Sequence, residues 1–199
     1  FSLWLERAEC AFLTGDFDQA ERLIAQLLQR GASKFDLAAV YRLKVLLHTV
    51  KSESPQALGS ALTCLHLFGV DLPAHPTWEQ VQLEYETIWQ NLDGRPIQNL
   101  IDLPLMADPE MQAVTDMLSA MLPATYFTNL NLYYLLACRI VNVSMEYGVN
   151  GASANAYAFC GLNIVGSVFH RYRESFRSQS SHLTWSRSTA SSPTGQKSS

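Results

Sequence analysis

Charged residues are scarce in this sequence of 199 residues. They make up 16% of it, whereas a typical soluble domain has about 25%. The formal net charge is −4 and the pI is about 5.7, so positive charge has no overall excess. A protein that binds nucleic acid over a broad surface needs a basic face, and we therefore expect no nucleic-acid partner. Because 48% of the residues are hydrophobic, the chain can bury the core of one sizeable domain.

Strand patterns and catalytic motifs are also lacking. No stretch shows the apolar–polar alternation typical of a β-strand, so the sequence predicts an all-α fold. Gly161 and Gly166 have the spacing of the first two glycines of a phosphate-binding loop, but Ser167 stands where that loop needs lysine. No G-x-S-x-G turn for a nucleophile occurs. We therefore predict no catalytic residue, no cofactor and no metal ion in this segment.

The cysteines are few and dispersed, and they form no C-x-x-C pair. Cys10, Cys64, Cys138 and Cys160 each lie within an apolar helical pattern, which predicts buried, reduced thiols in a cytoplasmic protein. Cys64 and His66 come closest to a metal site, but a zinc site needs more than two ligands. The cysteines therefore indicate packing rather than chemistry.

The histidines and carboxylates are scattered rather than gathered around a nucleophile. His48 and His66 lie in apolar helical patterns, and we interpret them as core or interface side chains. Helix starts, a turn and a solvated helix face account for the acidic residues Asp16, Asp18, Asp102, Asp108, Glu79, Glu84 and Glu86. One basic cluster comprises Arg171, Arg173 and Arg177, and it has two interpretations: a solvated helix end, or a contact with phosphate or an acidic partner.

Long hydrophobic runs suited to a membrane are lacking as well. Residues 147–170 carry no Asp, Glu, Lys or Arg, but they include asparagines, serines and four glycines. A membrane-spanning helix needs about 20 predominantly apolar residues, so we interpret this stretch as a buried helix pair. Glu6, Arg7 and Glu9 interrupt any apolar core near the start, and we therefore expect no signal peptide.

What the sequence does contain is a pair of helical hairpins, the first from Trp4 to Gly31. Its two helices join at Gly15, which suits a tight turn, and at Asp16, which suits a helix N-cap. Large and small residues recur as in a tetratricopeptide repeat, at Trp4, Ala8, Gly15, Phe17, Ala20 and Ile24. The sequence therefore predicts that the two helices approach closely at the small residues.

The second hairpin runs over residues 37–69 and matches the same pattern more loosely. Ser54 is predicted as the N-cap of its second helix, with Pro55 at the first helical position. Ala57 takes the place of Ala20, at an offset close to the ~34-residue tetratricopeptide period. The protein is thus predicted to be a stack of hairpins.

Further helices are predicted in the rest of the chain. Thr77 and Gln80 form a capping box, and apolar residues at helical spacing follow as far as Leu92. The other expected helices are a short one over 97–105, one from Asp108 that Pro123 stops, a central buried one over 129–147 ending at Gly148, and a last one over 152–176. These predict a tetratricopeptide-like α-solenoid of about seven or eight helices over residues 1–177.

Aromatic residues gather late in the chain, at Tyr126, Phe127, Tyr133, Tyr134, Tyr147, Tyr157 and Phe159. At helical spacing such residues usually form a core, and a concave peptide groove is the alternative. The composition then changes at Ser178, because residues 178–199 include nine serines and no acidic residue. This composition predicts a disordered tail.

Several segments resemble one family: ERAECAFLTGDFDQAERLI, VYRLKVLLHTVKSESPQAL, HPTWEQVQLEYETIW, RPIQNLIDLPLMADPEMQA and FHRYRE. The resemblance is to the helical-repeat region of large bacterial sensor kinases. It covers residues 5–177 and is most specific at 101–106 together with Asp108 and Pro109. Proteins of this family combine a serine/threonine-kinase-like domain, an AAA-type ATPase, a tetratricopeptide-like array, a GAF domain and a histidine-kinase module.

The resemblance implies a position after the ATPase and before the GAF and histidine-kinase modules of a two-component signalling protein. ATP is implied only for the parent protein, because this segment has no phosphate loop, kinase catalytic loop or phosphoacceptor-histidine motif. Our first hypothesis is a non-catalytic helical scaffold that contacts neighbouring domains or a protein or peptide partner. The alternatives are a fragment of an ATP-dependent serine/threonine or histidine kinase, and a free-standing peptide-binding adaptor. Whether the parent activity makes it part of an enzyme stays open.

The resemblance stops after Arg177, where the family would continue with another amphipathic helix. We hypothesise that residues 178–199 arise from a shift of reading frame, which translation of the other frames tests. The last helix would then lack a cap, leaving Ile164, Val165 and Val168 partly uncovered and favouring self-association. At the other end, Trp4 would face a preceding hairpin.

Overall fold

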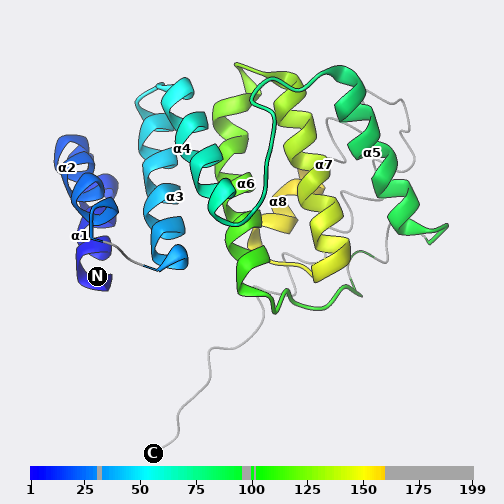
Figure 1. Ribbon diagram of the computed structural model, residues 1–199, viewed down its shortest axis with the longest axis horizontal. Coiled ribbons are helices and arrows are strands. Elements are labelled where there is room, and N and C mark those ends of the chain that lie inside the picture. Colours follow the sequence, from blue (N-terminus) through cyan, green and yellow to red (C-terminus); the bar gives the residue numbers. More distant parts are fainter. Residues whose placement is uncertain (31–32, 96–99, 101, 160–199) are drawn as a thin grey trace, which may run out of the picture.

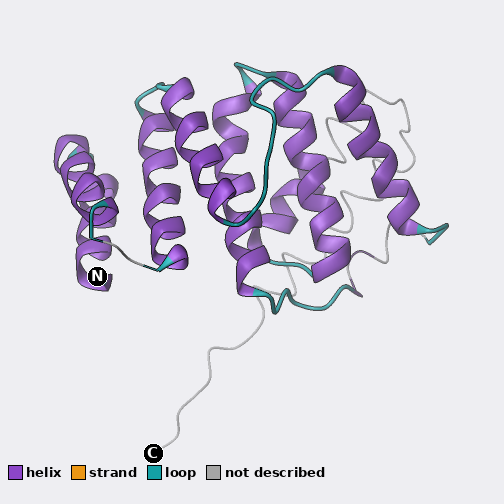
Figure 2. Ribbon diagram, viewed as in Figure 1, coloured by secondary structure: helices purple, strands orange, loops and turns teal. Residues whose placement is uncertain are grey.

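The computed structural model describes residues 1–30, 33–95, 100 and 102–159 (Figure 1). Within these residues the chain forms helices and no strand, which confirms the predicted all-α fold (Figure 2). The eight helices of the described part are α1 (Ser2–Leu13), α2 (Phe17–Leu28), α3 (Lys34–Val50), α4 (Ser54–Leu67), α5 (Trp78–Leu92), α6 (Pro109–Tyr126), α7 (Leu130–Tyr147) and α8 (Gly151–Phe159).

The helices stack in a row of hairpins. The α1–α2 hairpin packs through α2 on α3, and both α3 and α4 pack on α6. Helix α7 pairs with α6, α5 lies on the far side of α7, and α8 packs behind α6 and α7 (Figure 1). The third hairpin is therefore α6–α7 rather than the next pair along the chain, because the segment after α4 crosses the front of α6 and α7 before α5 begins.

The first hairpin forms as its residue pattern predicts. Gly15 adopts φ +80°, which side chains rarely allow, and the Asp16 carboxylate accepts a hydrogen bond from the Gln19 backbone N–H at 3.1 Å. Ala8 and Ala20 are completely buried, so small side chains let α1 and α2 approach closely. The tetratricopeptide-like spacing of large and small residues thus has a direct packing role.

Helix α3 is buried on two faces and joins two hydrophobic clusters. Val40, Leu43 and Leu47 pack with the α1–α2 hairpin. Ala38 and Val45 belong instead to the larger cluster that extends through α4, α5, α6, α7 and α8. In the sequence, the apolar residues of α3 occur around the whole helix. They do so because α3 packs on the α1–α2 hairpin with one face and on the larger cluster with another.

Most of the predicted helix ends are confirmed. Thr77 and Gln80 form the expected capping box, and Asp108 accepts hydrogen bonds at the start of α6 as predicted; Asn129, predicted as the first residue of the central helix, is instead the N-cap of α7. Helix α7 is the buried central helix, and Gly148 ends it. The caps therefore fix where the helices of the larger cluster begin.

Two predicted boundaries are wrong. Ser54 is the first residue of α4 rather than its N-cap; Glu53 holds the cap position, and its carboxylate instead binds the His48 ring at 2.6 Å. Pro123 does not stop α6, which continues to Tyr126. A proline inside a helix removes one backbone hydrogen bond, but α6 continues past it, with Ala124 and Thr125 buried in its last turn.

Other predictions lie outside the described residues. These are the role of Gly31, most of the short helix over 97–105, the last helix beyond Phe159, the tail over 178–199, and the exposure of Ile164, Val165 and Val168. The domain division at residue 177 is therefore untested. Among the helices that the structure describes, none combines the length and the apolar character that crossing a bilayer requires.

Candidate functional site: an apolar cleft between α4, α6 and α7

The three histidines in the described ranges pair with carboxylates or an amide. His48 is buried and binds Glu53, as expected for a core histidine, and this hydrogen bond is the main cause that lowers the pKa of the Glu53 carboxyl. His66 was predicted to be a core or interface residue, but its side chain is exposed and binds Asp71. Helix α4 turns that side chain outward, since its buried face is set by Ala57, Ala61 and the residues aligned with them.

The cysteines differ in their exposure to solvent. Cys64 and Cys138 are buried as predicted, whereas Cys10 is exposed, which corrects that prediction; Cys160 lies outside the described residues. Cys10 points away from the face of α1 that carries Ala8 and Ala11 against α2. Burial raises the pKa of the Cys64 thiol from the ordinary 9.0 to about 11, which makes it a poor nucleophile.

We expect Cys10 to react with a thiol reagent such as dithionitrobenzoate at least about tenfold faster than Cys64 near neutral pH, because Cys10 is exposed whereas Cys64 is buried and its pKa is raised. The absorbance of the thionitrobenzoate released from the reagent measures the two reaction rates. The Cys160→Ser substitution is made first, so that Cys160 does not contribute. A second substitution, Cys10→Ser, should remove the fast phase. A fast phase that survives it would contradict the assigned burial.

No group of three or more histidine, cysteine or acidic side chains that could hold a metal ion occurs in the part of the chain that the structure describes. Glu84, predicted to be solvated, is mostly buried: it pairs with Arg139 at 2.7 Å and accepts from the Asn142 amide at 2.8 Å. The packing of α5 on α7 brings these three side chains together. The carboxylate thus joins two helices.

The aromatic set divides between core and surface. Tyr133 and Tyr157 are buried, whereas Tyr126, Phe127 and Tyr147 are exposed. The rings of Tyr126 and Tyr133 meet edge to face with centroids 5.1 Å apart. The aromatic residues therefore form neither one core cluster nor the lining of one groove.

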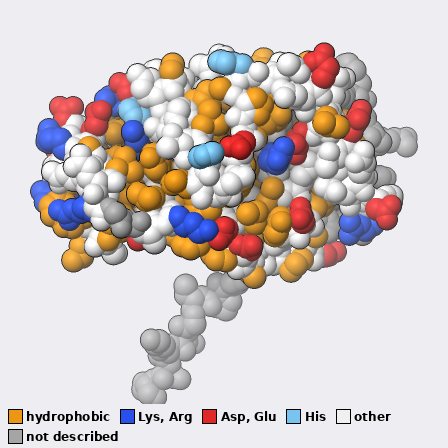
Figure 3. Space-filling view, in the orientation of Figure 1, with side chains coloured by type: hydrophobic (Ala, Val, Ile, Leu, Met, Phe, Trp, Pro, Cys, Tyr) orange, Lys and Arg blue, Asp and Glu red, His pale blue; other side chains and the backbone are white. Residues whose placement is uncertain are grey.

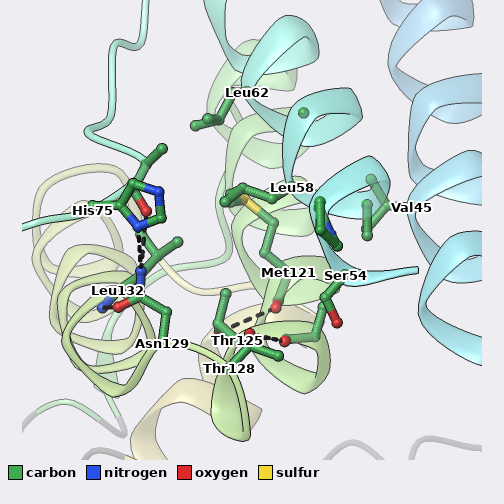
Figure 4. Close-up of a pocket in the computed structure, with 15 residues that line it drawn as sticks. Val45, Ser54, Leu58, Leu62, His75, Met121, Thr125, Thr128, Asn129 and Leu132 are labelled. Atoms are coloured by element: carbon green, nitrogen blue, oxygen red, sulfur yellow. Dashed lines mark hydrogen bonds between the residues drawn. The ribbon is translucent and has the colours of Figure 1, made fainter. Parts of the chain in front are cut away.

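An apolar cleft lies elsewhere, between α4, the linker that follows it, and the adjoining ends of α6 and α7. Its volume is about 460 Å³, within the range of ~300–1,000 Å³ that is usual for small-ligand sites. In Figure 4, Leu58 of α4 and Met121 of α6 approach each other in the middle of the cleft. Val45, Leu62 and Leu132 add apolar surface, so the walls favour apolar side chains.

The polar groups on the cleft walls are mostly engaged within the protein. The Thr125 hydroxyl donates to the Leu122 carbonyl at 3.0 Å, and the Thr128 hydroxyl donates to the Ala124 carbonyl at 2.6 Å. Such bonds to the preceding helical turn satisfy the hydroxyl groups within the chain. The arrangement therefore offers an apolar surface with a hydroxyl rim rather than a set of reactive groups.

Asparagines at the start of α7 hold the linker that forms one wall of the cleft. The Asn129 amide donates to the Ala74 carbonyl at 3.0 Å and lies 3.4 Å from His75 Nδ1. The Asn131 amide donates to the Pro76 carbonyl at 3.1 Å. Because the side chains of one helix fix the linker backbone, the cleft is formed before any ligand binds.

Sequence reasoning did not predict that these residues share a cleft. The one available signal was Gly59, which lies inside α4 and lines the cleft, because a glycine inside a helix lowers its stability and often has a packing or functional reason. Met121 and Leu132 look like core residues in the sequence. Only the crossing of the linker over α6 and α7 brings α4 and α7 to one cavity.

The chain is 21% identical over 187 residues to the hybrid signal transduction histidine kinase G of Dictyostelium discoideum. The match covers 85% of this chain and 5% of that protein, so the chain spans only a small part of its length. No protein-family profile matches the chain. No solved structure matches it either. The sequence is thus distantly similar to one segment of a signal-transduction kinase, and no helical-repeat family is shown.

Proposed function

We propose that this chain is a non-catalytic helical scaffold segment of a signal-transduction kinase and that it acts by contact. The observation that carries the proposal is the preformed apolar cleft, whose threonine hydroxyls are engaged within their own helix. The occupant would be apolar side chains of a neighbouring module of the same protein or of a protein partner. The similarity to a segment of a histidine kinase supports the signalling context.

The stacked hairpins provide a surface on which neighbouring modules or a protein partner can bind. Helices that contact only their neighbours form an extended surface, which is how helical-repeat proteins hold partners. The tetratricopeptide-like label, the neighbouring ATPase module and the cytoplasmic location belong to the same proposal. In that setting, a change in the neighbouring module would reach the next one through the packed helices.

We expect Gly59→Leu to close the cleft and Gly59→Ala to leave it open. A Cβ atom at Gly59 meets nothing within 4 Å, so both side chains have room. The probe is anilinonaphthalene sulfonate, whose fluorescence rises in apolar clefts. We expect Gly59→Leu to lower that fluorescence about threefold relative to Gly59→Ala, and Gly59→Ala to stabilise the fold by about 0.5–1 kcal/mol. Equal fluorescence in the two variants would contradict a binding cleft at this position.

The main alternative is a kinase fragment that retains ATP chemistry, which the similarity to a histidine kinase favours. Calorimetric titration of the whole chain with magnesium and ATP separates the two. The scaffold proposal expects no binding heat. Saturable binding would overturn it in favour of the kinase alternative.

A further inference from the structure

A second cleft lies on the first hairpin and has a different chemistry. It is lined by Trp4, Arg7, Gln19, Arg22, Leu23 and Gln26, and we name it the Trp4 cleft. Its volume is about 420 Å³. The buried Leu23 side chain gives it an apolar floor, while Arg7 and Arg22 are exposed. The Trp4 cleft is thus a basic site in a chain whose net charge is −4.

The Trp4 indole holds two guanidinium groups. The Arg30 guanidinium carbon lies 4.4 Å from the centroid of the Trp4 ring, and that of Arg7 lies 5.6 Å from it. An arginine over an aromatic face is attracted to the ring and oriented by it. With its amide oriented to accept from Arg7 Nη2 at 3.2 Å, Gln19 fixes that side chain further. Both guanidinium groups are therefore held against the same indole before any ligand arrives.

The arginines of the Trp4 cleft form no ion pair within the part of the chain that the structure describes. Ion pairs engage Lys34, Arg42, Lys51 and Arg139, whereas none involves Arg7, Arg22 or Arg30 in the ranges that the structure describes. Two acidic residues of the hairpin pair with cations outside it: Glu9 with Arg42 and Glu21 with Lys51. Figure 3 shows basic side chains at the end of the molecule formed by α1 and α2.

We propose that the Trp4 cleft, with Arg30 at its edge, binds an acidic helical segment of a protein. Guanidinium groups pair with carboxylates through two parallel hydrogen bonds. Carboxylate residues three or four positions apart on a helix have Cβ atoms about 5–6 Å apart. Arg7 and Arg30 contact the same indole, and in the complex each pairs with one carboxylate of the acidic segment. Leu23 then takes an apolar side chain of that turn.

Nucleic acid fits the Trp4 cleft less well than an acidic helical segment does. A phosphate backbone requires a continuous basic track, but Asp16 and Asp18 lie on the same hairpin and the whole chain is acidic. The proposal concerns a different surface from the apolar cleft. Its test is therefore independent of the scaffold proposal.

The test is a titration of a fluorescent, alanine-based helical peptide with glutamates four residues apart, followed by anisotropy on the full chain. The cleft variant is Arg7→Gln/Arg22→Gln/Arg30→Gln. The matched control is Lys34→Gln/Arg42→Gln/Lys44→Gln, which removes the same charge from α3. We expect the cleft variant to bind about tenfold more weakly or worse, and the control to change affinity less than about twofold.

Further controls separate specific pairing with carboxylates from general attraction between charges. The same peptide with glutamine in place of glutamate should not bind, and binding should weaken as salt rises from about 50 to 200 mM. The variant Arg7→Lys/Arg30→Lys keeps the charge but loses the planar fork and should bind less well than the wild type. Circular dichroism verifies that each variant is folded. Equal loss in both triple variants, no binding to the wild type, or tighter binding of single-stranded DNA overturns the proposal.

Discussion

Replacing Gly148 by alanine is expected to destabilise the fold by about 3 kcal/mol or more, because the residue combines a strained backbone with a close contact. Gly148 has φ +98° and ψ 178°, a conformation almost restricted to glycine. A Cβ atom there would lie 2.5 Å from the Pro104 carbonyl oxygen and 3.0 Å from the Met106 nitrogen. Both neighbours are backbone atoms, which cannot rotate away.

The same contact joins two parts of the chain. The Val149 N–H donates to the Pro104 carbonyl at 2.8 Å, and the Met106 N–H donates to the Val149 carbonyl at 2.9 Å. A shift of Gly148 therefore breaks the bridge that fastens the segment before α6 to the end of α7. Urea denaturation measures the effect. The control is Gly151→Ala, since a Cβ there meets nothing within 4 Å; a loss of similar size in the control would contradict the explanation.

Shortening Leu118 to alanine is expected to cost about 2–5 kcal/mol, the usual range for a fully buried leucine. Leu118 has no exposed surface and lies on α6, which contacts α3, α4, α7 and α8. The missing side-chain atoms would leave a cavity between helices that have little freedom to close it. The urea midpoint reports the loss, provided that the slope of the transition is unchanged.

Leu83→Ala is the matched control for that measurement. Leu83 is 65% exposed on α5, so the same truncation should change the free energy of unfolding by no more than about 0.5 kcal/mol. If the two variants lost equal stability, α6 would not be the centre of the core. Because α6 also forms part of the apolar cleft, the comparison shows whether that wall of the cleft belongs to the stable core.

Two surfaces of different chemistry follow from this fold. The apolar cleft depends on the linker that crosses α6 and α7, and Asn129 and Asn131 hold that linker in place. The Trp4 cleft belongs to the first hairpin alone. A scaffold with an apolar and a basic contact surface can hold two neighbours at once, and the two sets of variants test the surfaces separately.

The local structure of this chain follows from residue type and spacing alone. Gly15 with Asp16, Thr77 with Gln80, and Asn129 act through neighbours within a few residues, so the helix starts and the first hairpin could be predicted from residue type and spacing. The absence of alternating apolar and polar residues was enough to predict an all-α fold.

The tertiary structure decided everything that depends on which helix covers which face. Cys10 and His66 lie in apolar patterns yet are exposed, because a neighbouring helix covers only one side of α1 and of α4. Glu84 is buried because α7 brings Arg139 to it. Both clefts join residues from separate helices, and the arginines of the Trp4 cleft look like ordinary surface charges along the chain. Long-range packing sets these features, and it leaves no periodic mark in the sequence.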